Sequence, residues 1–106
     1  MWAKPNKAEL QRMEKNWKKD EENPEITGHF FMGSCDWWIA SKDPKSSLMF
    51  GYAILNGDWQ MSEWGYIDMD ELATLKQSFL QVDFDKHWIV KRWKEVEEKA
   101  KEQYGG

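Results

Sequence analysis

Three side chains that could share a metal ion alternate near the end of the chain: Asp83, Asp85 and His87. Alternate residues of an extended segment point to the same face, so two carboxylates and an imidazole would be presented together. Asp85 is equally suited to cap a helix that follows it. A small-ligand or metal-dependent enzyme that uses these three residues is therefore an alternative hypothesis. The sequence predicts no metal and no cofactor, because no matching ligands with metal spacing occur elsewhere.

A second reactive pair is Cys35 with His29. A cysteine attacks substrates as the thiolate, which requires a neighbouring base or positive charge. A lone cysteine in a turn is more typical of an inert thiol. The sequence contains no glycine-rich phosphate loop, no serine nucleophile elbow and no zinc-knuckle spacing. These observations favour a protein that is not an enzyme.

Length and composition predict a single cytoplasmic domain. The chain has 106 residues and a formal net charge of −4, enough for one modest core. Its longest apolar runs are shorter than the roughly 20 residues of a membrane span, and residues 1–7 lack the apolar stretch of a secretory signal. One cysteine makes no internal disulfide, which favours a reducing compartment. We expect one domain over 1–106, divided into 1–24, 25–85 and 86–106.

The first part, 1–24, is expected to be an amphipathic helix. Strong helix formers dominate Pro5–Glu22, with apolar residues at helical spacing. Asn6 and Glu9 form a capping-box pair, in which each side chain accepts a hydrogen bond from the other residue's amide. Asn23 and Pro24 should end the helix.

Two further helices are predicted after the middle of the chain. Asp68 and Glu71 form a second capping-box pair ahead of a short helix over Met69–Gln77. A long helix should occupy 86–106. Its apolar seam comprises Ile89, Trp93, Val96 and Ala100.

The part from Glu25 to Asp68 has the composition of an antiparallel meander, with short aromatic and β-branched runs separated by turn residues. A fifth short strand over Gln81–Phe84 is possible. We expect Ser47–Leu55 to be central and the helices to cover one face of the sheet, an α+β fold of four to five strands. The four predicted strands are Ile26–Met32, Asp36–Ser41, Ser47–Leu55 and Gln60–Asp68.

Tryptophan is over-represented, with 8 residues in the chain. Adjacent Trp37 and Trp38 must point to opposite faces of a strand, so at least one meets the core. Trp59 and Trp64 lie beside a turn and near a strand end. Large aromatics at such positions are common anchors of protein interfaces.

Charge is divided along the chain. Residues 1–19 carry six basic and two acidic groups, 20–85 carry three and thirteen, and 86–106 carry six and four. The acidic middle would repel phosphate backbones, so direct nucleic-acid binding is disfavoured. Acidic residues are often only a solvated surface, but a coherent acidic surface would attract a basic protein. The predicted partner-binding residues are Asp36, Asp43, Asp58, Trp59, Glu63, Trp64, Asp68, Asp70 and Glu71.

Several short motifs between Ile26 and Trp88 resemble a family of small prokaryotic proteins, domain of unknown function 2958. The resemblance implies an aromatic strand, a Trp-rich strand and two further strands before a short helix, in a protein of plasmids, integrative elements or phages. It implies no catalytic residues. The motifs are His29-Phe30-Phe31, Asp36-Trp37-Trp38, Phe50-Gly51-Tyr52, Glu63-Trp64-Gly65-Tyr66-Ile67 with Leu72, and Val82-Asp83-Phe84-Asp85.

These observations favour a non-enzymatic, acidic protein-binding module. With the resemblance, they suggest a mobile-element accessory protein that occupies a basic surface of a host nucleic-acid-handling defence complex, as an anti-CRISPR inhibitor would. The expected partner is a basic surface of a host protein or nucleoprotein, with no direct contact to nucleic acid or membrane. A homo-oligomer with a Trp-rich self-interface is a third hypothesis.

Overall fold

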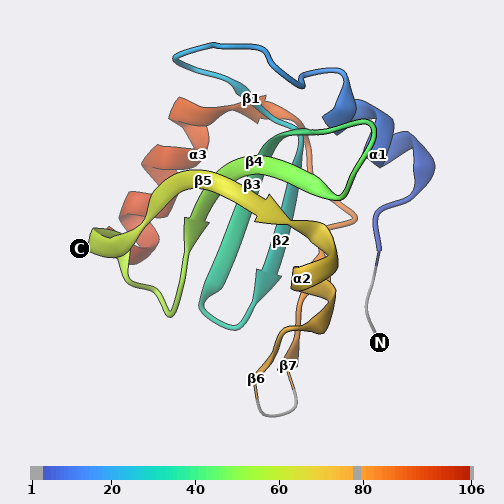
Figure 1. Ribbon diagram of the computed structural model, residues 1–106. Coiled ribbons are helices and arrows are strands. Elements are labelled where there is room, and N and C mark those ends of the chain that lie inside the picture. The colour runs from blue at the N-terminus through green and yellow to red at the C-terminus, as the bar shows by residue number, and fades with distance from the viewer. Residues whose placement is uncertain (1–3, 78–79, 106) are drawn as a thin grey trace.

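The computed structural model describes residues 4–77 and 80–105 and shows an α+β fold around a five-stranded antiparallel sheet (Figure 1). The sheet order is β5-β4-β3-β2-β8. Two-stranded pairs β1-β9 and β6-β7 lie beside it. The strands are β1 (Glu25–Ile26), β2 (Gly28–Met32), β3 (Cys35–Lys42), β4 (Leu48–Ile54), β5 (Glu63–Asp68), β6 (Lys76–Gln77), β7 (Leu80–Gln81), β8 (Asp83–Phe84) and β9 (Lys91–Arg92). The helices are α1 (Lys7–Glu14), α2 (Met69–Thr74), α3 (Trp93–Ala100), a 3-10 turn η1 (Trp59–Met61) and a π-helical turn η2 (Lys101–Gly105).

The central strand is β3, whereas the sequence had favoured the strand that follows it. Every residue of β3 is buried, while β4 has both buried and half-buried positions. A strand that is buried on both faces must be covered on both faces. The alternation in the sequence of β4 did not show which strand is central, because β3 and β4 are both rich in apolar residues.

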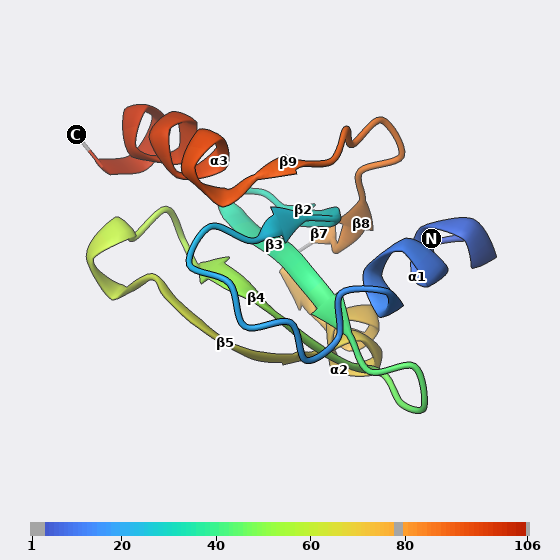
Figure 2. The ribbon, with the colours of Figure 1, turned by 90° about the horizontal axis from the view of Figure 1, so that it is seen from above.

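The helices accordingly cover both faces of the sheet, which corrects the expectation of one covered face. Trp37 packs with Phe30, Met49 and the residues of α1, α2 and β8. Trp38 packs on the opposite face with α3. Figure 2 shows α3 on one side of the sheet and α2 on the other. The prediction that the two adjacent tryptophans diverge is confirmed, and both are buried.

The first and last helices are shorter than predicted. The Asn6–Glu9 capping box is present, but α1 ends at Glu14, and the chain turns through Lys18 in the left-handed region at φ 68°. The helix expected from residue 86 begins at Trp93 instead. Residues 91–92 pair with β1 and are therefore extended. No described helix is long and apolar enough to cross a bilayer.

Glycine is required at Gly51, where β4 pairs with Ile39 of the central strand β3. A Cβ added at Gly51 would lie 2.3 Å from the carbonyl oxygen of Trp38. Gly65 is the ladder partner of Gly51 on β5, and a Cβ there would meet nothing within 4 Å. The two glycines are therefore a matched pair, one enclosed by backbone and one open.

We expect Gly51→Ala to lower the free energy of unfolding by about 3 kcal/mol, because the added methyl group displaces backbone in a packed sheet. Gly65→Ala should change it by less than about 1 kcal/mol, since the site is open. Urea unfolding of both variants measures the difference. Equal losses in the two variants would contradict this description of the sheet.

Candidate functional site: the acidic edge of the sheet

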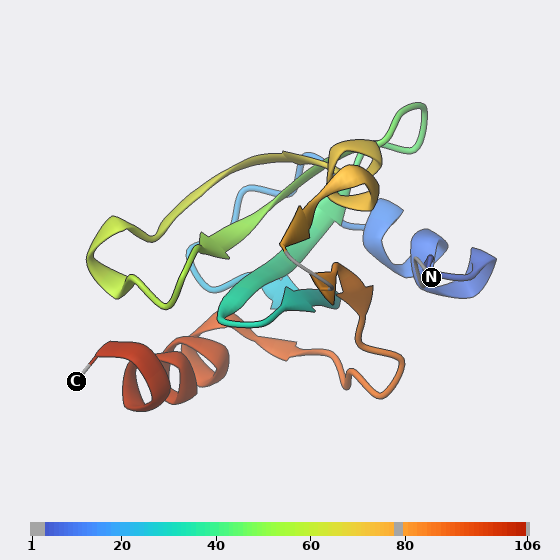
Figure 3. The same ribbon diagram turned by 90° about the horizontal axis from the view of Figure 1, so that it is seen from below.

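Strand β5 forms an open edge of the sheet. It pairs with β4 only, and Figure 3 shows it at the rim, away from β2. The amide of Met69 donates to the carbonyl of Ser47 at 2.9 Å. Because hydrogen-bonded pairs alternate in an antiparallel ladder, residues 63, 65 and 67 bond inward to β4. The backbone groups of Trp64 and Tyr66 therefore point outward, away from the sheet.

The chain around this edge carries only one sign of charge. Residues 46–75 contain five acidic residues and no Lys, Arg or His. None of these carboxylates makes an ion pair with a described residue. We call the following residues the acidic edge: Asp58, Trp59, Glu63, Trp64, Tyr66, Asp68, Asp70 and Glu71.

Seven of the nine residues predicted to bind a partner thus belong to one edge of the sheet. They are not one compact patch, because the strand itself separates them: Asp58 and Trp59 precede β5, whereas Asp70 and Glu71 follow it in α2. The rise of the six-residue strand places the two groups roughly 17 Å or more apart. The arrangement is an elongated acidic line with aromatic side chains along it.

The aromatic side chains of the edge are anchored from beneath. The ring of Trp64 stacks on Phe50 with centroids 5.6 Å apart and meets Trp93 edge-on at 4.9 Å. Tyr66 meets Phe50 edge-on at 5.4 Å and is 70% exposed. Trp59 lies against Tyr52 with centroids 5.9 Å apart. These contacts hold the rings in fixed positions, so binding would cost little side-chain entropy.

The acids at the two ends of the edge also have structural roles. Asp58 caps η1 by accepting from the amide of Met61. Asp68 caps α2 by accepting from the amide of Asp70, but the reciprocal Glu71 bond of the predicted capping box is not formed among the described residues. The hydroxyl of Ser47 donates to Asp68 at 2.8 Å, and this bond with the Asp70 amide lowers the pKa of Asp68 below its ordinary value of 3.8. Asp68 therefore stays charged at neutral pH.

Two predicted partner-binding residues lie away from the edge. Asp43 sits in the turn between β3 and β4, where it accepts from the amide of Lys45. Asp36 is only 8% exposed and bonds inside the protein, so the prediction that it contacts a partner is wrong. Its carboxylate lies 2.7 Å from Nε2 of His29 and accepts from the hydroxyl of Tyr104. His29 is seven residues away on the neighbouring strand, but Tyr104 is 68 residues away, so spacing could not reveal that contact.

The predicted metal ligands do not converge. Strand β8 ends at Phe84, and Asp85 begins a turn in which its Oδ1 accepts from the amide of His87. The other oxygen, Oδ2, lies 3.4 Å from Nδ1 of His29. No group of three His, Cys, Asp or Glu within residues 4–77 and 80–105 is arranged to hold a metal ion. Cys35 is buried, and its sulfur accepts from the amide of Asn56, while His29 bonds to aspartates.

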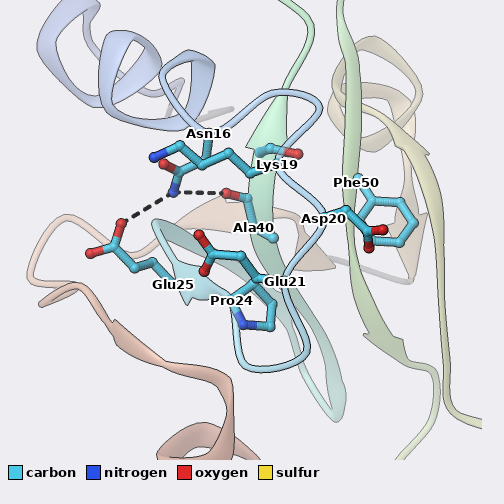
Figure 4. Close-up of a pocket in the computed structure, with 9 residues that line it drawn as sticks. Asn16, Lys19, Asp20, Glu21, Pro24, Glu25, Ala40 and Phe50 are labelled. Carbon is cyan, nitrogen blue, oxygen red and sulfur yellow. Dashed lines mark hydrogen bonds between the residues drawn. The ribbon is translucent and has the colours of Figure 1, made fainter.

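Sequence reasoning missed the hollow beside the aromatic face. The loop after α1 forms shallow cavities against β4 and β5, of about 80, 220 and 300 Å³. Asp20 and Phe50 line all three of them. Figure 4 shows the smallest, where Asn16 donates to Glu25 and to the carbonyl of Ala40. The only sequence feature that marks this hollow is the run of three acidic residues at 20–22.

Two basic groups of the terminal segments pair with acids outside the edge. Lys86 pairs with Glu9 at 3.4 Å, and Arg92 pairs with Glu21 at 2.9 Å. The buried ammonium of Lys42 lies 3.3 Å from Glu14. None of these three ion pairs includes a carboxylate of the acidic edge. Lys18 and Lys19, however, line a cavity together with Asp20 and with Tyr66 of the acidic edge, so basic groups also lie beside it.

No family model, curated protein or solved structure matches the chain. The resemblance to domain of unknown function 2958 accordingly stays a prediction.

The buried Asp36 network predicts a pH dependence of stability. Burial, and then the hydrogen bond to Asp36, raise the pKa of Tyr104 well above its ordinary value of 10.0. The phenol of the unfolded chain ionises first, so this stabilisation is complete below about pH 10 and is lost as pH rises further. We expect the free energy of unfolding to fall more steeply above about pH 10 in the wild type than in Tyr104→Phe.

Tyr104→Phe should itself cost about 1–2 kcal/mol at neutral pH, because it removes a hydrogen bond to a carboxylate. Urea unfolding of both proteins across the alkaline range checks both statements. Parallel curves for the two proteins would show that Tyr104 does not couple to stability in this way.

Proposed function

We propose that this chain is a non-enzymatic protein-binding module whose acidic edge occupies a basic surface of a host protein. The observation that carries the proposal is the acidic edge itself: five carboxylates without a cation over residues 46–75, none of them in an ion pair with a described residue. An unpaired line of negative charge steers positively charged partners toward it. Such a field also repels phosphate backbones, which disfavours direct binding of nucleic acid.

The anchored aromatic side chains support the same proposal. A basic protein surface presents Lys and Arg, whose cationic groups bind over aromatic faces and whose stems cover apolar area. Trp64 and Tyr66 offer such faces on the same side of β5 as the carboxylate of Asp68, because alternate residues of a strand share a face. Charge and aromatic contact thus act on the same type of partner side chain.

The basic surfaces of nucleic-acid-handling complexes fit this chemistry best. Their grooves collect Lys and Arg to bind phosphates, so an acidic chain that occupies such a groove would exclude the nucleic acid. On this chemistry and on the predicted resemblance, we propose that the chain is an accessory protein of a plasmid or phage that inhibits a host defence complex. The identity of the complex is left to experiment.

A charge-reversal pair tests the module. Glu63→Lys with Glu71→Lys reverses exposed charges at the two ends of the edge and leaves both capping aspartates in place. Glu98→Lys with Glu102→Lys is the matched control, because it makes the same change of net charge on exposed positions of α3 and η2. The immobilised proteins are exposed to a bacterial lysate at moderate and high salt, and retained proteins are quantified by mass spectrometry.

We expect the edge variant to retain its basic partner about tenfold less than the wild type, from roughly 0.7 kcal/mol for each reversed charge. The control variant should retain it normally, and high salt should release it from the wild type. Equal recovery by all three proteins at both salt concentrations would refute the acidic edge as the binding surface.

A further inference from the structure

We infer that the partner binds by strand addition: an extended basic segment pairs with β5 and becomes the sixth strand of the sheet. This inference rests on the proposed function and specifies how the acidic edge is used. The ladder geometry is its first support. The outward N–H and C=O groups of Trp64 and Tyr66 make no hydrogen bond to any described residue outside the β4–β5 ladder. Unpaired edge groups are a template for another strand.

The edge also lacks the features that usually prevent strand addition. Natural edge strands are blocked by lysine, proline, bulges or a covering helix. The register of β5 against β4 is continuous from Glu63 to Asp68. The strand contains no proline and no lysine, and the six-residue length is ordinary for a paired strand.

Gly65 places no side chain on one face of β5. A Cβ at this position would meet nothing within 4 Å, so the face of β5 opposite the aromatic rings is open at the middle of the strand. This open face leaves space for the side chains of an added strand, which itself would lie beside β5 in the plane of the sheet. On the other face, the exposed ring of Tyr66 lies where alternate side chains of an added strand would project.

Charge selects a basic segment over a second copy of this chain. Two-fold antiparallel pairing of two β5 strands would place the Glu63 end of each strand beside the Asp68 end of the other. The acidic edges of the two copies would then lie side by side, and their like charges would repel each other. A strand with Arg or Lys at alternate positions would instead meet the rings of Trp64 and Tyr66 and the carboxylate of Asp68, which the alternation of β5 places on one face.

Matched variants at Tyr66 separate backbone pairing from side-chain contact. Tyr66→Ala and Tyr66→Pro both remove the ring, but only proline removes the outward N–H. Proline is tolerated on edge strands where the N–H faces solvent, and thermal unfolding checks that both variants are folded. The probe is a synthetic peptide of about eight residues, long enough to span β5, in which arginine alternates with threonine.

Two altered peptides provide the controls that do not depend on folding of a variant. One carries N-methyl groups on alternate backbone nitrogens, which removes its donors along one edge. The other replaces arginine with glutamate. Binding is followed by NMR titration, with hydrogen exchange of the Trp64 and Tyr66 amides in the free and the bound protein.

We expect the arginine peptide to slow exchange at the Tyr66 and Trp64 amides and to bind Tyr66→Pro roughly fivefold more weakly than Tyr66→Ala, the effect of one lost backbone hydrogen bond. N-methylation on the pairing edge should weaken binding similarly, and the glutamate peptide should not bind.

Three results would overturn strand addition. If Glu63→Lys with Glu71→Lys weakens binding while the proline variant and the methylated peptide bind like their controls, the acidic module stands and strand pairing fails. If the arginine and glutamate peptides bind equally, the acidic edge fails as well. A concentration-dependent dimer that protects the Trp64 and Tyr66 amides without peptide would assign the edge to a second copy.

Discussion

The complete burial of the central strand β3 determines how the rest of the chain is arranged. All eight of its residues are buried, and its adjacent tryptophans enter separate cores on the two faces of the sheet. A small domain has few elements with which to cover two faces. Here α1 and α2 cover one face, and α3 covers the other. The covering elements are thereby concentrated on the faces around the centre of the sheet, and the far edge at β5 is left open.

The open edge coincides with the part of the chain that has no cations. Two cations of the terminal segments, Lys86 and Arg92, pair with Glu9 and Glu21 outside the acidic edge. The aromatic cluster beneath α3 extends outward through Trp64 and Phe50 to Tyr66. Packing that stabilises the second core therefore also fixes the rings at the edge. One set of contacts thus supports both the sheet and the aromatic rings at its edge.

Short sequence patterns predicted the structure of neighbouring residues, but they could not predict contacts between residues that are far apart in the chain. The Asn6–Glu9 capping box, the cap at Asp68 and the strands on either side of the Asn56–Gly57 turn follow from neighbouring residues and are present. The burial of Asp36 depends on Tyr104, which is 68 residues away. The late start of α3 similarly depends on the pairing of residues 91–92 with β1. Charge could be read along the edge from the sequence because all charged residues of 46–75 have one sign.

The state of the edge in the free protein is the most direct test of this account. Native-state hydrogen exchange by NMR reports each backbone amide of β5 separately. The account predicts an alternation: the amides of Trp64 and Tyr66 exchange rapidly with solvent, while those of Gly65 and Ile67, which bond to β4, are protected. Equal and strong protection at all four amides would show that the edge is already covered, and would contradict its assignment as the binding surface.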